Sequence, residues 1–136
     1  MNENLLAFCS ELEESIRSAY ESSLTVLEAE KLAAKFLAGS LKITNELEKC
    51  DLDRRMRKAG VKAIRAAVYL DHINRSEKKP SDTLLGALVD SDTIVNQQQN
   101  DLDVADVLVD KLKNYLSIFH EAHVFCRGIS KGAYNG

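Results

Sequence analysis

One proline in 136 residues most constrains what this chain can fold into. An all-β domain needs turn-forming residues about every 8–12 positions. Here the only proline is Pro80, and most of the six glycines stand alone within periodic stretches. The remaining sequence is rich in Ala, Leu, Glu, Lys and Gln, which are good helix formers. The chain is therefore predicted to be all-α, with one domain spanning residues 1–136.

Apolar residues at three- and four-residue spacing predict an amphipathic helix from Asn4 to about Ser22. A second helix is expected to begin near Ser23. Residues 42–45 are a weak helical stretch, which either continues this helix or ends it, and a basic helical region follows over about 46–74.

Residues 74–81 form the one clear loop of the sequence, because Pro80 disfavours helix at the residue before it. Beyond the loop, Ser81 or Asp82 is expected to cap a short helix that ends at Leu88 or Val89. Either Ser91 or Asp92 is then expected to cap the last helix.

The last helix, expected over about 92–127 and ended by Gly128, carries the strongest pattern of the chain. Its apolar seam alternates steps of three and four over more than three heptads, as in a coiled coil. The seam consists of Leu102, Ala105, Val109, Leu112, Leu116, Phe119, His123 and Cys126. We expect elongated antiparallel helices and a helical oligomer. Its interface is predicted at Leu102, Val109, Leu112, Leu116 and Phe119.

The net charge of −3 conceals four blocks of alternating sign. Residues 1–30 carry −6, residues 31–79 carry +7, residues 80–110 carry −7 and residues 111–136 carry +3. Blocks of this size predict either self-association or a localised patch for an anionic ligand. Pairing between helix faces of the same chain is the alternative.

Six basic residues and no acidic one lie between Arg54 and Leu70. At helical spacing they form a basic stripe about three turns, or ~16 Å, long, which is the reach of several phosphates. We define the basic stripe as Arg54, Arg55, Arg57, Lys58, Lys62 and Arg65. Tyr69 is the one aromatic residue available nearby for base stacking. Two alternatives remain open: pairing of the stripe with the acidic residues of 80–110, and contact with a membrane, which the lack of Trp and Phe disfavours.

Two clusters suggest metal binding but are better explained by structure. The first, His120, His123 and Cys126, falls largely on the apolar seam, which favours packing over a zinc site. The second, a row of aspartates, is expected to be solvated or paired with the basic helix; it comprises Asp103, Asp106 and Asp110. No cofactor-binding or catalytic motif occurs, so neither an enzyme nor a cofactor is predicted.

The residues before Glu30 lack the pattern of a secretion signal, which predicts a cytoplasmic protein. The three cysteines, Cys9, Cys50 and Cys126, are scattered and odd in number. They are expected to be free thiols.

Four segments, in this order, resemble the UvsY family of phage recombination mediators over nearly the full length. They are Leu24–Ala29 with Lys35–Leu37, the basic helix ending at Val61–Leu70, Val89–Ile94, and Arg127–Ile129. The resemblance implies a homo-oligomer, ring-like in form, that binds single-stranded DNA. It also implies that the protein helps a RecA-like recombinase displace single-strand binding protein. The family's DNA-contacting basic pair matches Lys62 and Arg65, or Lys58 in a shifted register.

The sequence thus predicts a recombination mediator that binds single-stranded DNA through Arg54, Arg55, Lys58, Lys62, Arg65 and Tyr69. The alternative is a helical protein–protein adaptor, such as a phage inhibitor of a host factor, acting through its acidic 80–110 surface. Exposure of the basic stripe distinguishes the two hypotheses.

Overall fold

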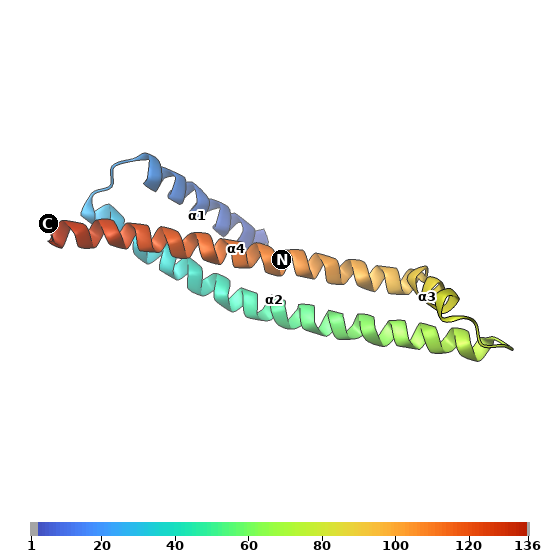
Figure 1. Ribbon diagram of the computed structural model, residues 1–136. Helices are drawn as coiled ribbons and strands as arrows, with labels where there is room; N and C mark the ends of the chain where they lie inside the picture. The colour runs from blue at the N-terminus through green and yellow to red at the C-terminus, as the bar shows by residue number, and fades with distance from the viewer. Residues whose placement is uncertain (1–2, 136) are drawn as a thin grey trace. The chain divides into compact units, whose positions relative to one another are not determined.

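The computed structural model describes residues 3–135. Within them the chain forms four helices and no strand (Figure 1). The helices are α1 (Glu3–Glu21), α2 (Val26–Arg75), α3 (Asp82–Asp90) and α4 (Thr93–Asn135). The predicted all-α class and the long C-terminal helix are confirmed.

Helix α2 begins at Val26, three residues later than predicted, because Thr25 provides its cap. The Thr25 hydroxyl accepts a hydrogen bond from the Glu28 amide at 3.2 Å and donates to the Glu28 carboxylate at 3.0 Å. This pairing is a variant of the capping box, in which the Glu28 carboxylate accepts from the Thr25 hydroxyl and not from the Thr25 amide. The helix then continues through residues 42–45, where Ile43 is fully buried.

The predicted caps of α3 and α4 are confirmed. The Ser81 hydroxyl accepts from the Leu84 amide at 3.2 Å, and the Asp92 carboxylate accepts from the Val95 amide at 3.0 Å. Each bond satisfies an amide that the first turn of a helix leaves without a backbone partner.

The predicted end of the last helix near Arg127 is wrong, since α4 continues to Asn135. Gly128 does not adopt the left-handed conformation that ends helices. A glycine within a helix costs only about 1 kcal/mol. Tertiary contact offsets this cost, because Ile129 and Ser130 are half-buried and the Ser130 hydroxyl donates to Glu30 at 3.2 Å.

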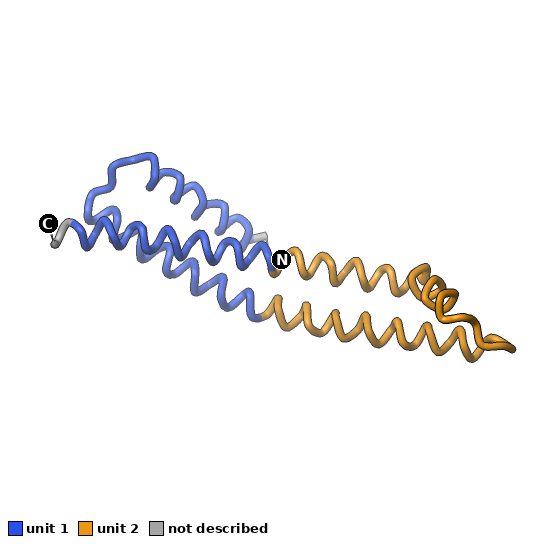
Figure 2. Tube along the Cα trace, in the orientation of Figure 1, with its two compact units in different colours: residues 1–48, 110–136 blue, residues 49–109 orange. Residues whose placement is uncertain are grey.

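The sequence indicated one domain, whereas the structure divides into two compact units (Figure 2). Unit 1 comprises residues 1–48 and 110–136, and unit 2 comprises residues 49–109. Helices α2 and α4 both run from one unit into the other.

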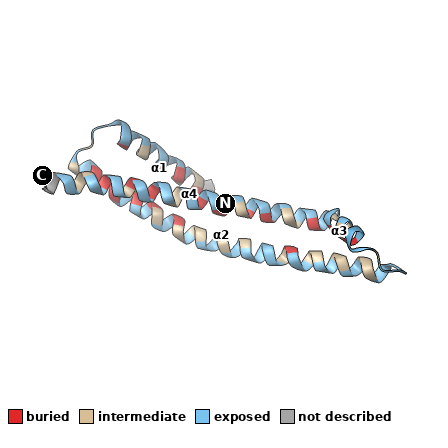
Figure 3. Ribbon diagram, in the orientation of Figure 1, coloured by how far each residue is buried: buried red, intermediate tan, exposed pale blue. Residues whose placement is uncertain are grey.

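Unit 1 is built from α1, the first part of α2 and the last part of α4. Its core is aromatic and aliphatic: the rings of Phe36 and Phe119 stack with centroids 6.5 Å apart, and Leu12, Ile43 and Leu112 are fully buried. Figure 3 marks the buried positions along the helices in red. Here α2 and α4 run antiparallel, because Phe36 meets Phe119 while the earlier Ala33 meets the later His123.

Unit 2 contains the later part of α2, all of α3 and the first part of α4. Its buried residues are mostly aliphatic and come mainly from α3 and α4: Val61, Leu85, Val89, Val95, Leu102, Ala105 and Val109. The two long helices are antiparallel here as well, since ion pairs join Arg54 to Asp106 and the later Arg57 to the earlier Asp101.

The apolar seam of the last helix faces its own chain. Six of its eight residues are buried and the other two are half-buried. The interface role assigned to five of them must therefore be corrected. Four are buried and the fifth is half-buried: Leu102, Val109, Leu112, Phe119 and, half-buried, Leu116. Side chains already covered by their own chain are not a surface for a second copy. A heptad seam does not specify whether its partner helix belongs to the same chain.

None of the helices in the described part of the chain is both long enough and apolar enough to cross a membrane. The three cysteines are free, as expected. Burial raises the pKa of the Cys9 and Cys126 thiols above its usual value.

Gly39 tests the packing of unit 1. A Cβ added there would lie 2.5 Å from Cδ1 of the fully buried Leu12. Crowding of about 1–3 kcal/mol then exceeds the gain in helix propensity of about 1 kcal/mol. We expect Gly39→Ala to lower the free energy of unfolding by about 1–2 kcal/mol in denaturant titrations followed by circular dichroism.

The matched control is Gly128→Ala, because nothing lies within 4 Å of a Cβ built at this helical position. This variant should be more stable than the parent protein by about 0.5–1 kcal/mol. Equal effects at both positions would contradict the close approach of α1 to α2 at Gly39.

Candidate nucleic-acid interface

The basic stripe lies on one continuous stretch of α2 within unit 2. Its six side chains do not share one environment, since the arginines are occupied by aspartates to different degrees. Three arginines reach across to the acidic block 80–110. The Arg65 guanidinium lies 2.7 Å from the Asp90 carboxylate, while Arg54 and Arg57 lie 3.7 and 3.9 Å from Asp106 and Asp101, respectively. Internal pairing, the alternative left open by the sequence, is therefore confirmed for these three.

Aspartates on α2 itself hold the first part of the stripe. Asp51 bonds both Arg54, at 2.8 Å, and Arg55, at 2.9 Å. Asp53 lies 2.9 Å from Arg57, and this hydrogen bond raises the pKa of the Arg57 guanidinium above its usual range. These are side-chain pairs at three- and four-residue spacing, which contribute only a few tenths of a kcal/mol each on a helix surface.

Lys58 and Lys62 have no ion-pair partner among residues 3–135, and both are exposed. Arg55 lies on the same side of α2 and its side chain is 71% exposed in spite of its bond to Asp51. At helical spacing the three span about 10 Å along one face. We call Arg55, Lys58 and Lys62 the open basic face.

Tyr69 continues this face by two turns and is half-buried. Together with Arg65 it lines a cleft of about 250 Å³ between α2 and α3, whose other walls include Gly86 and Val89. At helical spacing the predicted DNA-binding residues all lie on one side of α2, with Arg54 and Arg65 at the edge that faces the acidic residues. The Arg54 side chain is only 27% exposed and points to the contact with α4.

An exposed apolar row borders the open basic face. Its residues keep heptad spacing on α2 within unit 2, and every one of them is exposed: Leu52, Met56, Ala59, Ala63, Ala66 and Leu70. The sequence analysis noted the small residues but missed the row. The signal was available in the spacing, and only the structure shows that no other part of the described chain covers it.

Neither cluster of potential metal ligands forms a site among the described residues. Cys126 is fully buried, and His123 contacts the Ala33 carbonyl through Nδ1 at 2.8 Å. Asp106 faces Arg54, and Asp103 accepts a hydrogen bond from Gln99 at 3.0 Å. Packing or pairing thus involves Cys126, His123, Asp106 and Asp103, whereas His120 and Asp110 are exposed.

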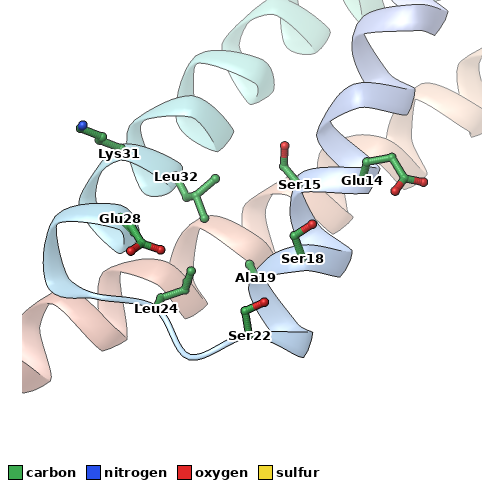
Figure 4. Close-up of a pocket in the computed structure, with 9 residues that line it drawn as sticks. All are labelled: Glu14, Ser15, Ser18, Ala19, Ser22, Leu24, Glu28, Lys31 and Leu32. Atoms are coloured by element: carbon green, nitrogen blue, oxygen red, sulfur yellow. The ribbon is translucent and has the colours of Figure 1, made fainter.

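A further cleft of unit 1, of about 490 Å³, lies where α1 turns into α2 (Figure 4). Leu24 and Leu32 form part of its apolar lining, and serines of α1 border it. Its polar groups already serve local structure: Ser15 donates to the Glu11 carbonyl at 3.1 Å and Glu28 belongs to the capping box.

Comparisons with known proteins give no match for this chain, whether to family models, to curated proteins or to solved structures. The resemblance to the UvsY family therefore stays a prediction, carried by the segments quoted above.

Measurements of the free energy of unfolding can test the distinction between paired arginines and unpaired lysines. Arg54 packs its stem between the helices and bonds Asp51, so Arg54→Ala removes both packing and a partner for a half-buried carboxylate. We expect Arg54→Ala to lower the free energy of unfolding by about 1–2 kcal/mol in urea titrations. Lys58→Ala should change it by less than about 0.5 kcal/mol. Similar losses at both sites would contradict the pairing described here.

Proposed function

We propose that this chain binds single-stranded DNA and acts as a recombination mediator. In this role it helps to load a RecA-like recombinase onto DNA covered by single-strand binding protein. The observation that carries the proposal is the open basic face, where Lys58 and Lys62 are exposed and lack an ion-pair partner in the described chain. No catalytic step is needed for this role.

The chemistry of the face favours contact with phosphates over recognition of bases. Lysines and an arginine on a helix neutralise phosphates and release counterions, which gives affinity without sequence preference. Tyr69 supplies a single ring for stacking at one end. A mediator must bind any sequence and must release it again, and weak contacts of this kind suit both needs.

The paired arginines can still contribute. Arg65 is 43% and Asp90 67% exposed, and ion pairs of this exposure are worth only about 0–1 kcal/mol. A phosphate can therefore replace Asp90 at small cost. Of the family positions matched by resemblance, Lys58 and Lys62 are available at once, whereas Arg65 must first leave its aspartate.

The adaptor hypothesis predicts that the basic stripe pairs with acidic residues of the same chain. The ion pairs of Arg54, Arg57 and Arg65 support it. Its acidic surface, however, is partly occupied, because Asp90, Asp101 and Asp106 each face an arginine of α2. We therefore favour DNA binding and make the adaptor role an outcome of the following test.

We expect Lys58→Ala with Lys62→Ala to weaken binding of fluorescent oligo-dT, measured by anisotropy from about 50 to 300 mM salt. Loss of two phosphate contacts should make the slope of log affinity against log salt less steep by about 1.4. Circular dichroism should be unchanged, since both side chains are exposed.

The matched control is Lys78→Ala with Lys79→Ala, which removes the same charge from the exposed loop after α2. It should leave the slope nearly unchanged. Equal loss in both double variants would mean that net charge alone attracts DNA. No binding by the parent protein at low salt would favour the adaptor.

The proposed homo-oligomer needs an interface other than the buried seam, and the exposed apolar row supplies a suitable one. Two copies of α2 packed antiparallel would match the row with itself. Leu52 would lie opposite Leu70, Met56 opposite Ala66, and Ala59 opposite Ala63. Large residues then meet at the ends and small ones at the centre, which allows close approach. Such a pairing would also join the open basic faces of two copies along one edge.

We expect Met56→Glu with Ala63→Glu to reduce the mass measured by light scattering toward the 15.1 kDa of one chain. Both positions are exposed, so the helical content should not change. The control is Val104→Glu with Val107→Glu, which places two acids on exposed valines of α4 in the same unit. An oligomer that persists in the first variant, or dissociates equally in the second, would exclude this interface.

A further inference from the structure

In unit 1, α2 and α4 form two grooves, and α1 fills only one of them. The other contains two clefts along α4, of about 470 and 410 Å³, which share His120 as a lining residue. We call this continuous surface the open groove. Ser40 and Leu116 line its first part, and Val124 and Arg127 line its second.

The floor and edges of the open groove are apolar. Leu116 is half-buried at the floor, and Val124 is 55% exposed. On α2, Leu37 lies one turn before Ser40 and Leu41 follows it. Both leucines are exposed, at 47% and 60%. These two leucines do not line the clefts themselves, but they flank Ser40 on α2, and exposed aliphatic residues that gather beside a cleft mark a surface for a partner.

Positive charge runs along the α4 edge of the open groove. Lys113, His120 and Arg127 repeat every seven residues, and Lys131 follows one turn later. No acidic residue lines either cleft, and none of the three strong bases forms an ion pair with another described residue. Glu121, the residue after His120, is exposed on α4 but lines neither cleft.

Ser40 adds an unused polar group to the same surface. Its hydroxyl oxygen is buried and has no hydrogen-bond partner in the described part of the chain, although its residue lines the first cleft. Buried hydroxyls are normally satisfied, and an unsatisfied one costs about 1–3 kcal/mol. The first cleft thus has an unsatisfied hydroxyl directly beneath its surface.

Helix α1 shows what a groove between α2 and α4 accepts. It buries Leu5, Cys9, Leu12 and Ala19. It also belongs to the acidic block of residues 1–30. Lysines of the partner helix contact it, since Lys35 donates to the Ser15 hydroxyl at 3.1 Å and Lys42 lies 4.2 Å above the Phe8 ring.

We propose that the open groove binds an acidic amphipathic helix of a partner protein. The charge of the groove is complementary to such a helix, and its aliphatic lining suits the helix's apolar face, as in other helix-in-groove complexes. Nucleic acid fits less well, because no Phe, Tyr or Trp lines the two clefts to stack on bases. The site is in unit 1 and is independent of the open basic face in unit 2.

The probe is a fluorescein-labelled synthetic helix of about 18 residues, with leucines at heptad a and d positions and glutamates at the flanking ones. We expect it to bind the full-length protein in anisotropy titrations, and the same peptide with lysine in place of glutamate to bind far more weakly. Lys113→Glu with Arg127→Glu should reduce affinity for the acidic peptide by about tenfold or more. Leu37→Ser with Leu41→Ser should also reduce it, without loss of helix content.

The control for the charge variant is Lys78→Glu with Lys79→Glu, which makes the same change of charge outside the groove. It should retain peptide affinity within about twofold. Equal binding of the acidic and basic peptides, or equal loss in both charge variants, would overturn the proposal. Displacement of the peptide by oligo-dT would assign the groove to nucleic acid instead.

The remaining alternative is that a second copy of this chain binds in the open groove. Light scattering separates it, because Lys113→Glu with Arg127→Glu would then lower the mass of the unliganded protein. Unchanged mass with lost peptide binding supports a partner helix. Failure of DNA binding at Lys58 and Lys62 would leave this result untouched, so the two proposals stand or fall separately.

Discussion

The antiparallel contact of α2 with α4, made in each unit by apolar side chains at heptad spacing, is the interaction on which the other features depend. Two helices in contact each bury one stripe and leave their other faces to solvent. In unit 1, α1 covers one further groove by burying Leu12 and Cys9. In unit 2, α3 contributes Leu85 and Val89. The surfaces that remain uncovered are those to which we assign function.

Reversal of the chain at the loop after Arg75 places a basic segment opposite an acidic one. The ion pairs of Arg54, Arg57 and Arg65 with Asp106, Asp101 and Asp90 follow from this reversal, and each pair is partly exposed. Pairs of this kind add little stability. They do disfavour other alignments of the two helices, which would bring like charges together. Their second effect is to use most of the arginines and to leave the lysines open.

Much of the fold was predictable because local chemistry dictates it. Ser81 and Asp92 cap helices from sequence position alone, and Pro80 marks the loop. The end of α4 was not predictable, because its continuation past Gly128 is accompanied by contact of Ser130 with Glu30, a hundred residues away. The prediction that the seam forms an oligomer interface was wrong for a similar reason. Leu112 and Phe119 pack against a partner helix, and their spacing does not indicate whether that helix belongs to the same chain.

The amino-acid sequence by itself determined that this protein is helical, where most of its helices begin, and that its charge lies in blocks, because each of these depends on residues close together along the chain. Only the tertiary structure decided which cations remain open. Lys58 and Lys62 differ from Arg54 and Arg65 in what lies across from them, not in local pattern. It also decided that the groove beside Ser40 is uncovered while the opposite one is filled by α1. The physical reason is that the exposure of a helix face depends on which distant helix packs against it. The spacing of residues within one helix does not predict that partner.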